Sequence, residues 1–187
     1  MTSARDPQAT NVPERNSWFV ITGGPSSGKT TVINRLHKMG MRVVPEQARA
    51  ILDEEMVAGR SADDIRADGE WFQQQILERQ LARESELEQG ETVFFDRGVP
   101  DGLAYERFLN LIVDPALAAA ARRASYRRVF VLDPLPLHDD GSRIEDDEDQ
   151  RGIHDAIVAT YAELGFDTVA VPGLPVDERV AFIRERL

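Results

Sequence analysis

The sequence predicts an α/β fold in three layers, with a five-stranded parallel sheet and helices on both faces. Two observations support this fold class. Five short apolar runs, at residues 18–22, 41–44, 92–96, 127–133 and 167–171, alternate with stretches whose apolar residues recur at helical spacing. Strands that alternate with helices imply a parallel sheet, whose strands are apolar because both of its faces are covered.

Each expected helix has a local signal. The stretch after the first strand places Val32 and Leu36 on one stripe, and the last residues of the chain repeat this spacing. Gly59 and Gly90 are stop signals, and Pro115 breaks a longer helical region. The expected helices cover residues 29–39, 45–59, 69–90, 101–124, 153–164 and 176–187.

The composition favours a single domain at residues 17–187 and argues against two classes of partner. A net charge of −11 argues against the positive surface that nucleic-acid binding needs. No apolar run is long enough to span a bilayer, and residues 1–16 are polar without periodicity. We therefore expect a flexible tail at residues 1–16, no nucleic-acid or membrane partner, and a cytoplasmic protein. The oligomeric state stays open.

A glycine-rich loop follows the first strand. In ITGGPSSGKTT, four residues separate Gly23 from Gly28-Lys29-Thr30, which matches the P-loop pattern between a strand and a helix. Glycines let the backbone wrap around phosphate oxygens, Lys29 can reach the outer phosphates, and Thr30 offers a Mg²⁺ ligand. The residues expected to bind the nucleotide are Gly23, Gly24, Ser26, Ser27, Gly28, Lys29, Thr30 and Thr31.

An acidic residue and a basic residue follow the strand at residues 92–96. Asp96 lies where P-loop proteins hold a second metal-coordinating carboxylate, so we expect it to act on a metal or a proton. Arg97 comes next and can hold phosphate or the acceptor. Motor ATPases more often have two consecutive carboxylates here, so the Asp-Arg pair favours phosphate transfer over hydrolysis.

Candidate acceptor residues follow the second strand. Glu46 and Arg49 lie in VVPEQAR, next to the phosphate loop if the strands are arranged as in kinases. A carboxylate can serve as base for a hydroxyl acceptor, and a guanidinium can hold a phosphate acceptor, so both acceptor types stay open, as does an exposed helix start. Arg79 and residues 73–75 either line the same cavity or lie on a solvated helix face.

The segment at about residues 134–152 is polar and acidic, and it lies where small kinases carry a lid loop. Arg143 is the candidate lid residue that would approach the transferring phosphate. The acidic residues between 139 and 149 form either a solvated mobile loop or a surface that attracts a cationic acceptor. Acceptor binding that is sensitive to salt would favour the second interpretation.

Seven segments together carry a family resemblance: ITGGPSSGKTT, VVPEQAR, LERQ, FFDRGVPD, RVFVL, SRIED and YAELGFDTVAVP. They resemble the AAA-domain family of small predicted bacterial ATPases, which is similar to the nicotinamide riboside kinase domain and, more distantly, to deoxynucleoside and thymidylate kinases. This resemblance implies a kinase-like P-loop NTPase fold with a lid, and ATP with Mg²⁺ as phosphate donor. It implies that Asp96 holds the metal or acts as a base and that Glu46 and Arg49 contact the acceptor. It also implies that Arg97 contacts the phosphate or the acceptor, and that Arg143 makes a contact from the lid.

The favoured function is therefore an ATP–Mg²⁺-dependent phosphotransferase that moves the γ-phosphate to a small nucleoside-like or nucleotide-like acceptor. The alternative is an NTP-binding or hydrolysing switch without a small-molecule acceptor, although the chain has no Asn-Lys-x-Asp guanine motif. The candidate residues are Lys29, Glu46, Asp96, Arg97 and Arg143 for catalysis, Glu46, Arg49, Arg79 and Arg97 for the acceptor, and Thr30 and Asp96 for the metal. Asp96 and Glu46 compete for the role of base.

Overall fold

The sheet contains the strands that the sequence predicts. The computed structural model describes residues 17–88, 90–135 and 144–187, so the expected tail at residues 1–16 lies outside the described residues. The strands are β1 (Trp18–Thr22), β2 (Arg42–Val44), β3 (Val93–Asp96), β4 (Arg128–Leu132) and β5 (Thr168–Val171). Their order is β2-β3-β1-β4-β5 and every neighbouring pair is parallel. The five-stranded parallel sheet is confirmed.

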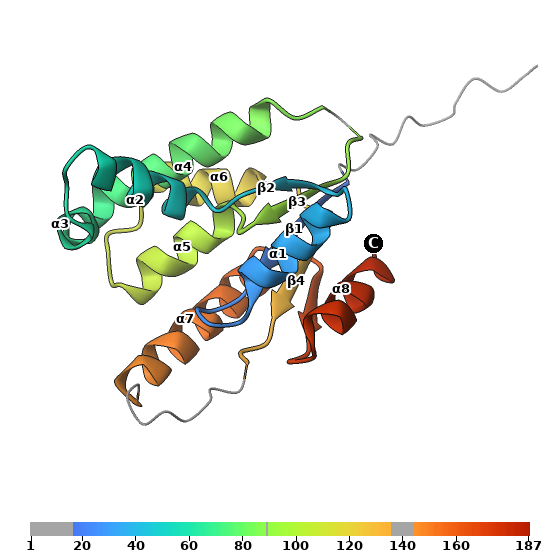
Figure 1. Ribbon diagram of the computed structural model, residues 1–187. Helices are drawn as coiled ribbons and strands as arrows, with labels where there is room; N and C mark the ends of the chain where they lie inside the picture. Colours follow the sequence, from blue (N-terminus) through green and yellow to red (C-terminus); the bar gives the residue numbers. More distant parts are fainter. Residues whose placement is uncertain (1–16, 89, 136–143) are drawn as a thin grey trace, which may run out of the picture.

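Helices cover both faces of this sheet (Figure 1). They are α1 (Lys29–Lys38), α2 (Gln47–Val57), α3 (Ala62–Ala67), α4 (Gly69–Ser85), α5 (Val99–Phe108), α6 (Pro115–Arg123), α7 (Ile144–Glu163) and α8 (Val176–Arg184). Helices α1 and α8 pack on one face, α5 and α7 pack on the other, and α4 and α6 pack against α5. The three-layer fold is confirmed, but the sequence did not predict α3 or the start of α7 at Ile144.

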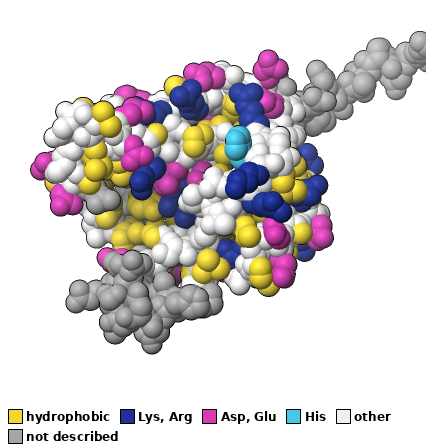
Figure 2. Space-filling model, in the orientation of Figure 1, with side chains coloured by type: hydrophobic (Ala, Val, Ile, Leu, Met, Phe, Trp, Pro, Cys, Tyr) yellow, Lys and Arg dark blue, Asp and Glu magenta, His cyan; other side chains and the backbone are white. Residues whose placement is uncertain are grey.

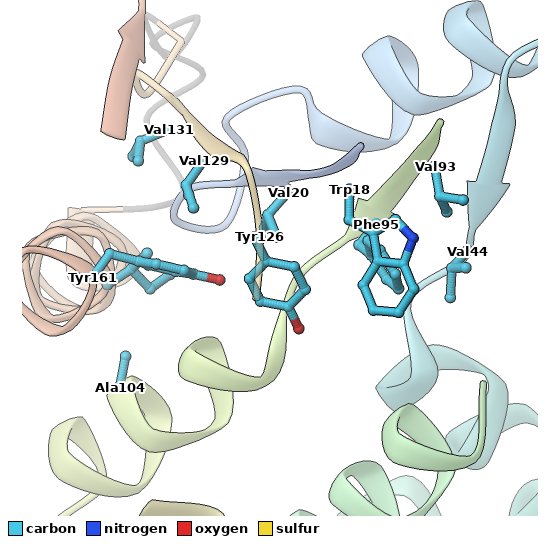
Figure 3. Packing of buried hydrophobic residues seen from close by; sticks show 11 residues of the cluster. Trp18, Val20, Val44, Val93, Phe95, Ala104, Tyr126, Val129, Val131 and Tyr161 are labelled. Atoms are coloured by element: carbon cyan, nitrogen blue, oxygen red, sulfur yellow. The ribbon is translucent and has the colours of Figure 1, made fainter. Parts of the chain in front are cut away.

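The alternation of side chains along β1 divides the core between the two faces. Trp18 and Val20 point into the cluster under α5 and α7, whereas Phe19 and Ile21 point toward α1 and α8. Figure 3 shows the first cluster, in which the Trp18 ring packs against Phe95 with the ring centroids 5.5 Å apart. Because both faces of β1 are buried, its first four residues are all apolar rather than alternating with polar ones.

The topology brings the candidate site residues to one edge of the sheet. In a parallel sheet the carboxyl ends of all strands meet at the same edge, where ligands bind. Strand β3 lies beside β1, with Asp96 in register with Ile21. Strand β2 lies beyond β3. Glu46 follows β2 and reaches this edge beside Arg97, and its charge acts on Lys29 inside the phosphate loop.

The surface carries charges of both signs. On the face shown in Figure 2, Lys and Arg side chains lie among Asp and Glu side chains. Examples of exposed pairs are Arg35 with Asp177, 2.8 Å apart, and Arg83 with Glu86, 3.1 Å apart. Such exposed pairs each contribute about 1 kcal/mol or less to stability. Within the described residues, no helix is long and apolar enough to cross a membrane.

Candidate active site

The phosphate loop joins β1 to α1 and has an unusual backbone. Gly23, Ser26 and Gly28 adopt positive φ angles of 136°, 57° and 78°. A Cβ atom on Gly23 would lie only 2.6 Å from the carbonyl oxygen of Leu132, at the end of β4. Glycine is therefore required at this position both for the backbone angle and for the close approach of β4.

Lys29 is the first residue of α1, and its side chain is buried inside the loop. Its ammonium donates to the carbonyl oxygens of Gly23 and Gly24, at 2.8 and 2.7 Å, and to Ser27 Oγ at 3.3 Å. Burial lowers the pKa of Lys29 to about 8, and the positive charge of Arg97 adds to this shift. A phosphate oxygen in the loop could replace one of these carbonyls as partner and restore the charge balance.

Asp96 ends β3 and is almost fully buried, with 8% of its surface exposed. Burial raises the pKa of Asp96 to about 6, and the negative charge of Glu46 adds to the rise, against the opposing effect of Arg97 and Lys29. Its Oδ1 atom is buried and has no hydrogen-bond partner among the residues that the structure describes. A buried carboxylate oxygen without a partner, at the edge where the phosphate loop lies, fits a cation such as Mg²⁺.

The other metal candidate is Thr30, the second residue of α1, which is exposed. Its hydroxyl and the Asp96 carboxylate are the oxygen ligands that Mg²⁺ prefers. In the part of the chain that the structure describes, no three His, Asp or Glu side chains gather as a metal-binding group. A metal site made of these two side chains and nucleotide phosphates fits this donor set, because Mg²⁺ is usually held by few protein ligands.

Arg97 lies between the end of β3 and α5, with a positive φ of 70°. Such a backbone conformation in a residue other than glycine is unfavourable and needs support from its surroundings. The support comes from two carboxylates: Nε donates to Glu46 at 2.7 Å, and Nη1 donates to Asp101 at 3.3 Å. The guanidinium also lies over the ring of Tyr105, 5.1 Å from its centroid. Arg97 is therefore held rigidly with its charge toward the sheet edge.

Asp101, in the first turn of α5, is a carboxylate shared by four donors. Its Oδ1 accepts hydrogen bonds from Thr22 Oγ1 and from Arg97. Its Oδ2 accepts from the Gly98 N–H at 2.9 Å and from the Tyr161 hydroxyl at 2.7 Å. Asp101 is only 2% exposed, so this set of donors is what makes its burial tolerable. One side chain thus joins the ends of β1 and β3 to α5 and α7.

A cavity of about 280 Å³ opens beside Asp96 and Arg97. Its polar end is formed by Glu46, Asp96 and Arg97, and its apolar walls include Phe72 and Leu77. This volume and this division into an apolar body with a few polar groups are typical of small-molecule sites. The Phe72 side chain is half-buried and forms part of the cavity wall.

Gln73 is a further polar group on the cavity wall. It is 7% exposed, and its amide makes no hydrogen bond within the described part of the chain. Its Oε1 faces α5, 3.6 Å from the point where a Cβ on Gly102 would lie. By contrast, the amide of Gln80, which also lines the cavity, donates to Glu84 at 3.0 Å. Gln73 therefore has an unused donor and an unused acceptor next to the cavity.

The structure does not place Arg49 and Arg79 at this cavity. Arg49 is exposed and pairs with Asp53 one helical turn away, at 3.1 Å. Arg79 makes a two-point pair with Glu54, at 2.8 and 2.7 Å, on the outer side of α2 and α4. Their predicted contacts with the acceptor stay predictions, and both guanidinium groups already have carboxylate partners.

The expected lid is described only in part. Residues 136–143, including the candidate lid residue Arg143, lie outside the described residues. From Ile144 onward the chain is helical, so the acidic residues 145–149 belong to the start of α7 rather than to a loop. Further along α7, His154 Nδ1 accepts a hydrogen bond of 3.4 Å from the Gly24 N–H. Helix α7 therefore contacts the phosphate loop directly.

The chain matches a family model described as an AAA domain over residues 18–179, which is most of its length. The chain belongs to the AAA domain family. This match confirms the resemblance in the sequence, and it runs from β1 to the start of α8, with the phosphate loop, Asp96 and Arg97. A search of curated protein sequences finds no significant match.

Among solved structures, three illustrate the likeness of this AAA domain to P-loop kinases. Thymidylate kinase from Ehrlichia chaffeensis is 14% identical with a TM-score of 0.64, over 90% of this chain and 97% of that one. Deoxyadenosine kinase from M. mycoides with bound dATP is 16% identical with a TM-score of 0.59, over 90% and 98%. NadR protein in complex with NR is 20% identical with a TM-score of 0.67, over 91% of this chain but only 51% of NadR. At these identities the likeness establishes the fold.

Two residues that shape the site have no role in the sequence analysis. One is Asp101, and the other is Arg179 on α8, with a hydrogen bond to the phosphate loop. Gln73, by contrast, belongs to residues 73–75, which the sequence named as possible cavity lining, and it does line the cavity. A signal existed only for Asp101, because Gly98 and Asp101 frame a helix start with Pro100 between them. That pattern predicts a helix cap, but not the contacts of Asp101 with β1 and α7.

Proposed function

We propose that this AAA domain is an ATP–Mg²⁺-dependent phosphotransferase that moves the γ-phosphoryl group to a small nucleoside-like or nucleotide-like acceptor. The observation that carries the proposal is the cavity beside Asp96 and Arg97, because it gives an acceptor a place next to the phosphate loop. A protein that only hydrolyses a nucleotide needs a water there, not a cavity of about 280 Å³ with apolar walls.

The donor half is the phosphate loop with Lys29, Thr30 and Asp96. The loop N–H groups and the Lys29 ammonium would hold the phosphates, and Thr30 and Asp96 would hold Mg²⁺. When bound, Mg²⁺ neutralises charge on the phosphate oxygens. Since in-line transfer depends mainly on positioning and charge stabilisation, Arg97 would stabilise the transferring phosphoryl group from the acceptor side.

Transfer to a hydroxyl acceptor needs one base, whereas the phosphate oxygen of a nucleotide acceptor is already ionised. In the transfer, an acceptor hydroxyl oxygen forms a bond to the γ-phosphorus, the bond from that phosphorus to the bridging oxygen breaks, and ADP leaves. The hydroxyl proton needs a carboxylate, and both Glu46 and Asp96 line the cavity. We assign the proton to Glu46 and the metal to Asp96, because Asp96 has the unpartnered oxygen whereas Glu46 is already held by Arg97.

The acceptor class follows from Gln73 and the walls around it. An amide offers one donor and one acceptor side by side, so it matches a ring that carries a neighbouring acceptor and donor, such as a nucleobase or a carboxamide. Phe72 and Val99 provide apolar surface for the ring itself. Deoxyadenosine kinase with bound dATP and NadR in complex with NR are similar folds that bind ligands of this type.

An ADP-release assay tests the proposal. Purified protein with Mg²⁺ and ATP is mixed separately with nucleosides, nucleotides, nicotinamide riboside and small alcohols lacking a ring. Stimulation by one ring-containing class supports the phosphotransferase. Steady hydrolysis that no acceptor changes would instead favour the NTP-hydrolysing switch.

The assignment of the base is tested with Glu46→Gln, and the control is Glu55→Gln in α2, the helix that Glu46 precedes. Glu55 pairs with Arg60 away from the cavity. Glu46→Gln is expected to lose about 10²–10⁴-fold in kcat with the best acceptor while binding ATP normally, as for loss of a general base. Full activity in Glu46→Gln would remove Glu46 from this role.

A further inference from the structure

Arg179, near the middle of α8, is the largest fully buried side chain of the described residues, with 2% of its surface exposed. Its guanidinium donates to the carbonyl oxygens of Ser27, Pro172 and Asp133, at 2.5, 2.8 and 3.1 Å. These carbonyls belong to the three segments that follow β1, β5 and β4. One side chain therefore ties together three loops at the edge of the sheet where the phosphate loop lies.

The charge of Arg179 is not balanced by an ion pair. Among the described residues, no carboxylate lies within ion-pair distance of its guanidinium, and the more distant charge of Asp133 only partly offsets the effect of burial, which lowers the pKa of Arg179. A buried cation that has only carbonyl partners is expensive to desolvate, and an apolar side chain could fill the same space at lower cost. The retained charge therefore calls for a ligand of opposite sign, and the segment in contact with Arg179 is the loop that holds phosphates.

The contact with Ser27 also fixes the direction of a loop N–H group. In a planar trans peptide the C=O of one residue and the N–H of the next point in opposite directions. Because Arg179 holds the Ser27 oxygen on the α8 side, the Gly28 N–H must point to the other side, at the start of α1. A Cβ on Gly28 would lie 3.4 Å from Arg179 Nη1, so the guanidinium packs directly against this peptide.

We infer that Arg179 is a positioning residue for the nucleotide phosphates. Arg179 acts through the Ser27–Gly28 peptide by turning the Gly28 N–H toward the bound phosphates. The buried charge of Arg179 also attracts these phosphates from the α8 side of the loop. This role rests on the nucleotide site of the proposed function and adds α8 to it. The same guanidinium fixes the segments after β4 and β5 relative to the loop.

Binding of ADP with Mg²⁺, measured by calorimetry, tests this role without any acceptor or turnover. Arg179→Met keeps much of the apolar volume and removes the donors. The matched control is Arg128→Met, because Arg128 also donates to a backbone carbonyl, that of Arg186 at the end of the chain, and pairs with Asp167 at 2.7 Å. It lies at the start of β4, at the opposite edge of the sheet. We expect Kd to rise at least tenfold in Arg179→Met and less than twofold in Arg128→Met.

A second measurement separates positioning from a general loss of stability. In amide NMR spectra, the Gly28 N–H signal is expected to move or broaden in Arg179→Met and to stay in place in Arg128→Met. If Arg179→Met does not fold, Arg179→Lys replaces it, since a single ammonium cannot serve three carbonyls in the planar fork geometry of arginine. At least a threefold rise in Kd is expected for that variant.

The outcomes separate this inference from the proposed function. The role of Arg179 alone would be overturned if Arg179→Met kept the wild-type Kd and an unchanged Gly28 signal. If Arg179→Met does not fold, a wild-type Kd in Arg179→Lys would overturn it in the same way. A wild-type protein that does not bind ADP with Mg²⁺ would overturn the proposed function as well. If the protein binds ADP but transfers phosphate to no acceptor, the transfer part of the proposed function fails, and the Kd values of the Arg179 variants still decide the role of Arg179.

Discussion

Replacing Asp96 with asparagine is expected to stabilise the fold at pH 8 while abolishing phosphate transfer. Asparagine has nearly the same shape, but it carries no charge and cannot hold Mg²⁺ as a carboxylate does. The pKa of Asp96 is raised by burial, which means that the folded protein disfavours the ionised form. The native protein therefore carries an unfavourable charge at this site whenever the pH is above that pKa.

The size of the stability change follows from the shift in the pKa of Asp96. The pKa rises from 3.8 to about 6, so ionised Asp96 destabilises the fold by about 3 kcal/mol at pH 8. The sign is that of a carboxyl group with a raised pKa: the penalty is absent below the unfolded pKa and grows as the pH rises toward the folded pKa. At pH 4 it amounts to about 0.5 kcal/mol. Asp96→Asn should therefore gain stability at pH 8 and almost none at pH 4.

Urea unfolding followed by circular dichroism, without nucleotide or Mg²⁺, measures this difference at the two pH values. Asp177→Asn on α8 is the control, because the Asp177 side chain is 70% exposed and its replacement should change stability little. Equal or lower stability of Asp96→Asn at pH 8 would refute the reasoning. Activity is expected to fall below about pH 6 in the wild type, because protonated Asp96 cannot hold the metal.

Three further predictions concern the loop and the cavity. Because the pKa of Lys29 is lowered to about 8, affinity for ADP should fall as the pH rises from 7 to 9, which a titration series would show. Gln73→Leu should lower kcat/KM for the acceptor at least tenfold without destabilising the fold. Gln74→Leu, on the exposed side of α4, should leave kcat/KM unchanged. Equal effects of the two variants on kcat/KM would contradict a role for Gln73. Gly23→Ala should unfold at lower urea than Gly40→Ala, since both have positive φ but only Gly23 faces a backbone atom at 2.6 Å.

The sequence predicted the strands and the phosphate loop well because each is defined by a pattern of consecutive residues. Buried parallel strands are apolar throughout, and the loop pattern is a fixed spacing between a strand and a helix. Helix α3 escaped prediction because it is six residues long and only Ile65 among its described side chains is buried. The strand order could not be predicted from the sequence either, because strand pairing depends on contacts between segments that are far apart in the chain.

The parts of the site that the sequence missed reach it from distant elements. Arg179 lies 152 residues beyond Ser27, and Asp101 lies 79 residues beyond Thr22, so neither pair leaves a local pattern. Arg49 shows the converse case. Its spacing of four residues from Asp53 was a local signal for a pair on the helix surface, and the structure contains that pair.

The two halves of the proposed site are held in register by buried hydrogen-bonded groups rather than by the reacting residues alone. Asp101 accepts from Thr22, where the phosphate loop begins, and from Arg97 at the cavity, so the two positions cannot shift independently. Arg179 fixes the same loop from the side of α8. Phosphoryl transfer loses efficiency when donor and acceptor are misplaced by as little as about 1 Å. The proposed transfer thus offers a reason for the burial of Asp101 and Arg179 that stability does not, because apolar side chains would stabilise the fold more cheaply.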